Sequence, residues 1–272
     1  MEKVINFYKF YDIAGDDHIN PALAQILENM SSVNPNTRSA IYKNFENMVK
    51  QDIIKPPELI RILDICLSED YLYKNLGAIS DDVFARSSAS LIISTILEAN
   101  AGRRFLSIPI LDATCDRILE YITLENDTRG FVEGKGWAHA IAHAADMLQS
   151  LVSNTQIPTD KYPDVLGVIQ NCLFKDATYI DQEDERLVTV VKTMMQKGLE
   201  SAVLERWVLL LHSKIHNIYQ DAGGFTYTYH RANVNVCNFL KSLYFSFKTD
   251  GERLKLRVFI FDNIKQLQKA YQ

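Results

Sequence analysis

The sequence predicts an all-α protein built of stacked antiparallel helix pairs. Apolar residues recur with helical periodicity along nearly the whole chain, and strand signals are nearly absent. Helix-start signals follow one another closely, which gives about a dozen helices with short connections. Helices with small or polar stripes begin near Val83, Gly134, Asp184 and Thr226. Their spacing of roughly 40–50 residues is typical of HEAT-like solenoids, so the predicted fold is an α/α superhelix.

Proline and capping residues mark the helices of the N-terminal half. Asn20-Pro21 and Asn34-Pro35 each place a capping residue before a proline at the first helical position. Pro56-Pro57 closes one helix and opens the next. Two acids in Ser80-Asp81-Asp82 lie at the positive end of a helix dipole. Helices are predicted over residues 22–30, 35 to about 54, 58–67 and 83–99.

Similar signals continue through the C-terminal half. Pro109, Pro158 and Pro163 interrupt the apolar periodicity, and residues 181–184 begin another helix. No Gly/Ser-rich linker separates these helices, so we expect one all-helical domain over residues 1–272. An irregular α/α bundle is the alternative to the solenoid.

Composition and charge restrict the partners and the compartment. The formal net charge is −5 and there is no Lys/Arg-rich block, so nucleic acid is not expected as a partner. The apolar runs are too short to span a membrane, and residues 1–6 do not resemble a secretion signal. The four cysteines are far apart, as expected for buried thiols in a reducing compartment. We therefore expect a soluble, cytoplasmic protein that is not bound to a membrane.

One segment, residues 128–148, differs from the rest of the chain. Three glycines fall between Gly130 and Gly136, and an alanine-rich helix follows. A helical wheel places Trp137 on the apolar side. The opposite side carries Lys135, His139, His143, Asp146 and Ser150.

His139 and His143 are spaced i, i+4, with Asp146 three residues further on. Two imidazoles at this spacing can share a metal ion, with Asp146 as a third ligand or as a group that orients a histidine. The same three residues could serve a catalytic or polar-ligand site without metal, or their hydrogen bonds could fix helix packing. No cofactor is expected from the sequence, and a divalent metal at these residues is the one alternative that stays open.

The glycine-rich turn before this helix has two interpretations. Backbone amides at a helix N-terminus can bind an anion, to which Arg129 and Lys135 would add charge. The spacing is not that of a nucleotide-binding loop. Alternatively, the glycines supply a tight turn that lets Trp137 pack.

These residues resemble the signature of a bacterial family known only as domain of unknown function 2785. The matching residues are Arg129-Gly130-Phe131-Val132, Gly134-Lys135-Gly136-Trp137, His139, His143 and Asp146. The acidic run 184–187 is also similar to a feature of that family. The resemblance implies an all-helical cytoplasmic protein and assigns no activity.

Other helices carry further candidates. Glu185 lies on a polar helix side, and His230 and Asn233 follow a Gly-Gly turn in a segment dense in aromatic and polar residues. Arg86 lies on a serine stripe, from which it could supply positive charge to a groove. A second i, i+4 pair, His212 and His216, adjoins an apolar face, and we expect those two histidines to be packed.

Two functions remain open from the sequence. The first is a scaffold that binds a protein or peptide in a concave polar groove, as solenoids often do. The second is an enzyme or small-polar-ligand site centred on His139, His143 and Asp146, with Glu185 and His230 as further catalytic candidates. Arg86, Arg129, Lys135, Trp137 and Asn233 are the expected ligand-binding residues.

Overall fold

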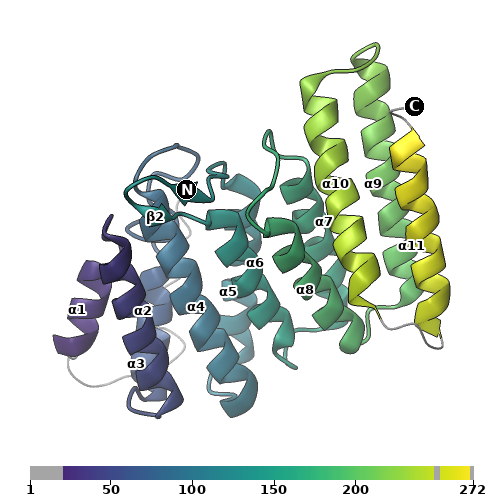
Figure 1. Cartoon of the computed structure of the whole chain (residues 1–272). Coiled ribbons are helices and arrows are strands. Elements are labelled where there is room, and N and C mark those ends of the chain that lie inside the picture. Colours follow the sequence, from purple (N-terminus) through teal and green to yellow (C-terminus); the bar gives the residue numbers. More distant parts are fainter. Residues whose placement is uncertain (1–20, 248–251, 270–272) are drawn as a thin grey trace. The chain divides into compact units, whose positions relative to one another are not determined.

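The computed structural model describes residues 21–247 and 252–269. Within them the protein is all-α, with eleven α-helices and one small two-stranded sheet (Figure 1). Residues 1–6, which carry the expectation about secretion, lie outside the described residues. The chain divides into two compact units, Met1–Pro158 and Thr159–Gln272.

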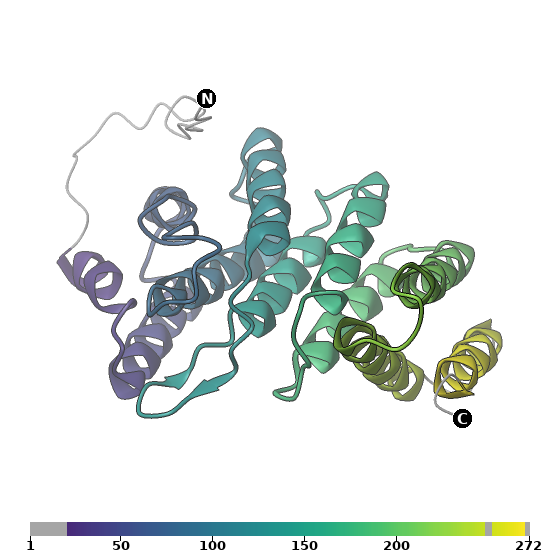
Figure 2. The ribbon, with the colours of Figure 1, turned by 90° about the horizontal axis from the view of Figure 1, so that it is seen from above.

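The first unit consists of helix pairs. Helix α1 packs on α2, α3 on α4 and α5 on α6, while α2, α4 and α6 lie side by side (Figure 2). A hairpin of strands β1 and β2 precedes α6. The elements are α1 (Pro21–Asn29), α2 (Pro35–Lys50), α3 (Pro56–Cys66), α4 (Val83–Arg103), α5 (Ile108–Leu124), β1 (Phe131–Val132), β2 (Gly136–Trp137) and α6 (Ala140–Ser153).

Side-chain pairs show that α2, α4 and α6 run in the same direction. Thr95 of α4 bonds to Tyr42 of α2, and further along both helices Arg103 bonds to the carbonyl oxygen of Val49. Between α4 and α6, Ser94 meets Ser150, and Asn100 then meets Asn154 just beyond the end of α6. Three parallel neighbours, each with its own partner helix, are the arrangement of stacked helix pairs that the periodicity predicted.

The proline and capping signals locate the helix starts correctly. Helices α1, α2 and α3 begin at Pro21, Pro35 and Pro56, and the Asn34 side chain accepts a hydrogen bond from the backbone nitrogen of Asn36 (2.9 Å). Two helix ends were predicted wrongly. Helix α2 stops at Lys50 because Asp52 takes a left-handed conformation (φ 55°), and α4 continues to Arg103.

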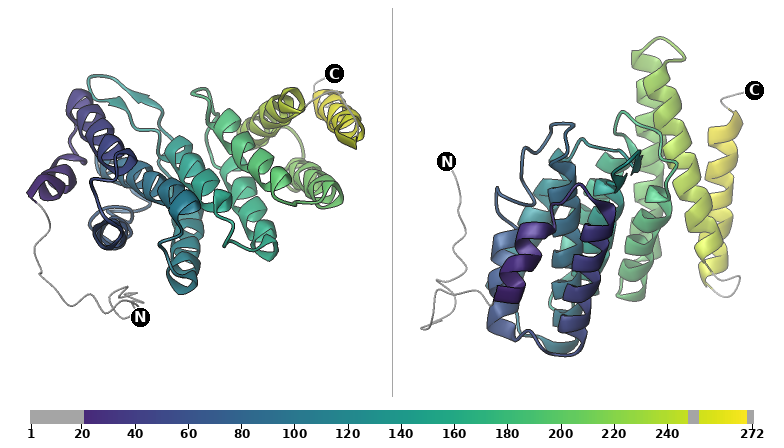
Figure 3. Two further views of the ribbon diagram at one scale, coloured as in Figure 1. Left: turned by 90° about the horizontal axis from the view of Figure 1, so that it is seen from below. Right: turned by 60° about the vertical axis from the view of Figure 1, so that its left-hand side comes forward.

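The second unit contains five α-helices among its described residues. Helix α10 packs against α8, α9 and α11. The long helices α9 and α10 extend beyond the ends of α7 and α8 (Figures 1 and 3). The elements are the short helix η2 (Thr159–Lys161), α7 (Tyr162–Leu173), α8 (Glu183–Gln196), α9 (Ser201–Asp221), α10 (Tyr227–Ser246) and α11 (Glu252–Lys269).

Two expectations from the sequence concern the cysteines and the apolar length of the helices, and the structure agrees with both. All four cysteines are buried, and none forms a disulfide in the part of the chain that the structure describes. Burial raises the pKa of the Cys66 and Cys172 thiols, as expected for packed side chains without redox chemistry. None of the helices within residues 21–247 and 252–269 has the length and apolar character that a membrane crossing requires.

Asp64 of α3 makes the stability of the protein depend on pH. Burial raises the pKa of the Asp64 carboxyl to about 6, above the ordinary value of about 3.9 in an unfolded chain. The folded protein therefore binds more protons than the unfolded chain between these values, and stability falls as pH rises through that window.

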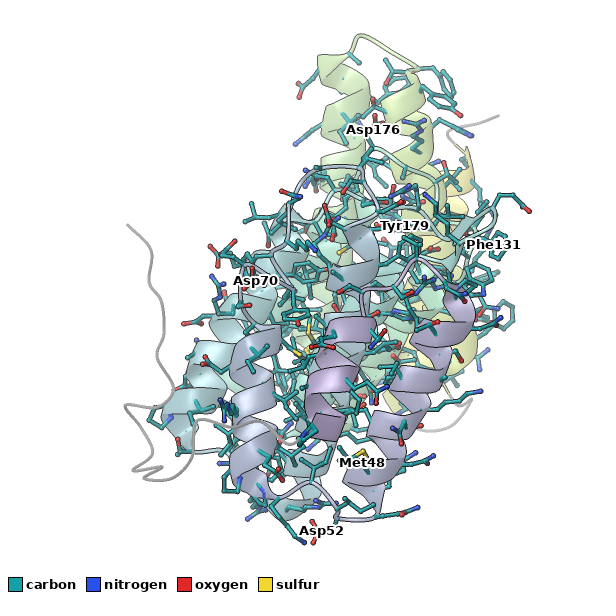
Figure 4. The ribbon with its side chains drawn as sticks, turned by 90° about the vertical axis from the view of Figure 1, so that its left-hand side faces the viewer. Met48, Asp52, Asp70, Phe131, Asp176 and Tyr179 are labelled. Atoms are coloured by element: carbon teal, nitrogen blue, oxygen red, sulfur yellow. The ribbon has the colours of Figure 1, made fainter. Side chains whose placement is uncertain are left out.

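We expect Asp64→Asn to remove this slope and to stabilise the protein at pH 7. Because the carboxyl is only half-buried, solvent screening reduces the gain to about 1 kcal/mol. Urea denaturation at pH 4, 5, 6 and 7 measures it. Asp70→Asn, at an exposed position in the loop after α3 (Figure 4), is the control and should keep the slope of the wild type. Equal slopes in wild type and Asp64→Asn would contradict the prediction.

Candidate functional site

A β-hairpin precedes α6 where the sequence predicted the start of a helix. Phe131 pairs with Trp137 and Val132 with Gly136, and the Lys135 backbone nitrogen donates to the carbonyl oxygen of Val132 (3.0 Å). Trp137 and Lys135 are therefore not on the helix. Their placement on the helical wheel was wrong because Gly134 and Gly136 both adopt left-handed conformations (φ 73° and 74°), which bend the chain into a turn.

The hairpin is held against the start of α2. Arg38 Nη2 donates to the carbonyl oxygens of Lys135 (2.7 Å) and Trp137 (3.2 Å). The guanidinium lies 4.0 Å from the centre of the Phe84 ring, and burial lowers the pKa of Arg38. Figures 2 and 3 show the hairpin on the α2 side of the first unit, opposite α3 and α5. Arg38 thus fixes the hairpin to a rigid helix.

Arg129 and Lys135, the two cations expected to bind an anion, are both paired with carboxylates. Arg129 contacts both oxygens of the buried Asp127 and donates to the Ser80 carbonyl oxygen (2.6 Å). The Lys135 ammonium contacts both carboxylate oxygens of Asp81 (2.7 and 2.8 Å). The Arg129 hydrogen bond to Ser80 and the Lys135 ion pair with Asp81 attach the hairpin segment to the loop before α4.

Arg86, another expected ligand-binding residue, is completely buried. Its guanidinium makes a two-pronged ion pair with Glu125 (2.6 and 2.9 Å) and donates to the Lys74 carbonyl oxygen (2.9 Å). Glu125 also accepts from the Tyr121 hydroxyl (3.0 Å). Burial acts to lower the pKa of Arg86, but the Glu125 hydrogen bonds and charge outweigh it, so the pKa is raised. Since this arginine reaches no surface, its charge is used inside the fold.

Two large aromatic side chains of the hairpin are exposed. Phe131 is 55% exposed and Trp137 is 49% exposed. Their rings pack edge to face with centroids 5.1 Å apart. Figure 4 shows Phe131 at the opposite end of α2 from Asp52. Exposed aromatic side chains held on a rigid support are typical of binding surfaces.

His139 connects the hairpin to α6. It is the N-cap residue in a left-handed conformation (φ 50°), which is unusual for a residue other than glycine. Its buried ring contacts the Trp137 ring (4.3 Å between centroids) and lies 5.7 Å from the His143 ring. Backbone conformations of this kind cost about 1–2 kcal/mol and persist where surrounding contacts enforce them.

His143 is held by a serine of the neighbouring helix. Its Nδ1 lies 2.7 Å from Ser87 Oγ, and the tautomer decides which atom donates. Further along, Ser94 bonds to Ser150 (2.9 Å) and Asn100 to Asn154 (2.7 Å). We call these three pairs the polar ladder between α4 and α6. The ladder uses part of the polar stripe for helix packing, as one of the interpretations from sequence expected.

The charges of carboxylates on three helices act on Tyr42 of α2. Burial raises the pKa of the Tyr42 hydroxyl, and the charges of Glu46, Asp146 and Glu98 act in the same direction. Asp146, predicted from the sequence, therefore lies near α2. Tyr42, Glu46 and Glu98 were not predicted, although Arg38, Tyr42 and Glu46 are spaced i, i+4, i+8 on one side of α2, which is a readable signal.

A metal centre gains no support from this geometry. Among the described residues, no three His, Cys, Asp or Glu side chains are grouped so that they could hold a metal ion. The structure brings Trp137, His139 and His143 into contact, but it does not make a ligand set of His139, His143 and Asp146.

The remaining candidates belong to the second unit. Glu185 is exposed on α8, and the partly exposed His230 ring stacks with Tyr227 (6.1 Å between centroids). Asn233 is buried in α10. His212 Nε2 donates to the Asn263 carbonyl oxygen (3.1 Å), and burial lowers the pKa of His212. Both histidines were expected to be packed. His212 is packed, but His216 is exposed, so the expectation was wrong for His216.

The fold and these contacts define an all-α protein of stacked helix pairs with a clamped hairpin in its first unit. The family described as "Protein of unknown function (DUF2785)" matches residues 72–245, more than half of the chain, and the protein belongs to this family. The match includes the hairpin and α6. No curated protein and no solved structure matches the chain.

Proposed function

We propose that the protein is a cytoplasmic, HEAT-like helical scaffold that binds a cationic segment of a partner protein. The binding surface would be the aromatic–acidic surface of the first unit, defined as Phe131, Trp137, Tyr42, Glu46, Glu98 and Asp146. The observation that carries the proposal is the exposed Phe131–Trp137 pair, which is fixed by Arg38 to α2. Exposed aromatic rings on such a support supply contact area at little entropic cost.

The charge of this surface favours a basic occupant. The charges of Glu46, Glu98 and Asp146 all act on the Tyr42 hydroxyl. Lys50 pairs with Glu46 and also interacts with the charge of Glu98. A Lys or Arg side chain could lie over the Trp137 ring while its neighbours meet these carboxylates. The family description and the overall charge of −5 are compatible with this role and add nothing to it.

We expect Trp137→Ala to weaken binding of a basic peptide at least tenfold, because it removes the central aromatic contact. The probe is a fluorescein-labelled peptide of alternating lysine and leucine, measured by fluorescence anisotropy, with a glutamate–leucine peptide for comparison. Phe245→Ala is the matched control, since Phe245 is an exposed aromatic residue (78%) on α10. The proposal fails if both peptides bind equally or if the two variants lose the same affinity.

One observation favours a second candidate function, acid–base catalysis by His143. Ser87 fixes the orientation of this partly exposed ring through Nδ1, as groups hydrogen-bonded to catalytic histidines do. Hydrolysis of p-nitrophenyl acetate would test it. Turnover that is lost in His143→Ala but kept in Ser94→Ala would support this candidate, and equal rates in all three proteins would exclude it for this ester.

A further inference from the structure

A cavity of about 230 Å³ lies between α10 and α11 of the second unit. Val234, Cys237 and Leu267 form an apolar part of its lining. Asn233 and Lys241 are among its polar lining residues. None of its lining residues belongs to the aromatic–acidic surface, so a ligand could bind in it whether or not the proposed function is correct.

Asn233 is a buried amide whose oxygen lacks a partner. Its side chain is 1% exposed, and no donor in the described part of the chain reaches Oδ1. Asn235, two residues later and equally buried, accepts from the Tyr179 backbone nitrogen (3.0 Å) and donates to the Ala177 carbonyl oxygen (2.8 Å). An unsatisfied buried acceptor costs about 1–3 kcal/mol. Asn235 thus has a structural explanation within the fold, and Asn233 has none.

Lys241 supplies a positive charge to the same cavity. The residue is partly exposed and has no carboxylate partner among residues 21–247 and 252–269. It lies eight residues after Asn233 on α10, which places the two Cα atoms about 12 Å apart along the helix axis. Val234, Asn238 and Lys241, spaced i, i+4, i+7, lie on one side of the helix.

We propose that this cavity binds a small linear monocarboxylate that carries an amine or hydroxyl group at its other end. The carboxylate would pair with Lys241, and the amine or hydroxyl would donate to Asn233 Oδ1 after a small side-chain movement. The methylene chain of the ligand would lie against Val234, Cys237 and Leu267. The ligand carboxylate would thus pair with the Lys241 ammonium, and the ligand donor would hydrogen-bond to the unpaired Asn233 oxygen.

The binding test uses 6-aminohexanoate as the probe, measured by isothermal titration calorimetry on the full chain. We expect saturable binding that weakens at least tenfold in Lys241→Gln. Hexanoate, which lacks the donor, and 6-amino-1-hexanol, which lacks the carboxylate, should each bind at least tenfold more weakly. Lys255→Gln, at an exposed lysine of α11, is the control and should bind like the wild type. Absence of binding to wild type at probe concentrations up to about 10 mM, or equal binding of all three probes, would overturn the proposal.

A stability measurement separates a ligand-binding role of Asn233 from a structural one. Asn233→Leu should abolish probe binding while leaving the thermal midpoint unchanged or higher, since it removes an unpaired acceptor. Asn235→Leu should lower the midpoint clearly, because it breaks the bonds to Tyr179 and Ala177. If Asn233→Leu destabilises the protein as much as Asn235→Leu does, Asn233 is structural and the proposal is wrong.

Discussion

Replacing Arg86 with methionine is expected to lower the free energy of unfolding by about 3–5 kcal/mol. The substitution leaves the Glu125 carboxylate buried without its counter-ion, at a place where both side chains have no exposed area. It also leaves the carbonyl oxygens of Lys74 and Ala78 without their donor. The loops before α4 and before the hairpin would loosen together, because this pair connects them.

Urea denaturation followed by circular dichroism measures this change. Lys50→Met is the matched control, because it removes a Lys–Glu pair of similar length (2.6 Å) from the surface of α2. We expect no measurable effect from the control, since exposed pairs contribute little. Equal midpoints for the two variants would show that the buried pair does not stabilise the fold.

Gly136→Ala is expected to destabilise the hairpin by about 2–4 kcal/mol, from overlap combined with backbone strain. A Cβ at this position would lie 2.8 Å from Cβ of Pro35, at the rigid start of α2, and the backbone is left-handed (φ 74°). The two effects add because neither Pro35 nor the hairpin can move without breaking the Arg38 bonds.

Gly134→Ala separates the two contributions. Gly134 has almost the same φ (73°), but a Cβ there would meet no atom within 4 Å. We therefore expect a loss of only about 1 kcal/mol from backbone strain. Denaturation of both variants, with peptide binding as a second measurement, tests the difference. If Gly134→Ala and Gly136→Ala lower the free energy of unfolding equally, close contact with Pro35 does not hold the hairpin in place.

Local signals in the sequence predicted most of the fold. A proline after a capping residue marks a helix start through its own geometry, so the starts at Pro21 and Pro35 needed no tertiary information. The hairpin was missed because its two strands have only two residues each, too few to show alternation. Three glycines between Gly130 and Gly136 signalled a turn, but the pairing of Phe131 with Trp137 depends on Arg38, about 100 residues earlier.

The candidate site was predicted only in part. The sequence pointed to Trp137, His139, His143 and Asp146, which lie along one part of the first unit. The sequence could not show that Arg86 is buried, because its partner Glu125 is 39 residues away on the chain. Lys135 was assigned to a ligand for the same reason, since its partner Asp81 is also distant in sequence. Asp127, the ion-pair partner of Arg129, is only two residues away and was a local signal that was not used.

The polar ladder limits how α4 and α6 can move. Three polar pairs join these helices at successive points along their length. A slide of one turn, about 5.4 Å, would separate Ser87 from His143, Ser94 from Ser150 and Asn100 from Asn154 at once. The polar ladder therefore fixes the position of α4 relative to α6 along their axes. Any force applied at the hairpin would move α4 and α6 as one rigid piece.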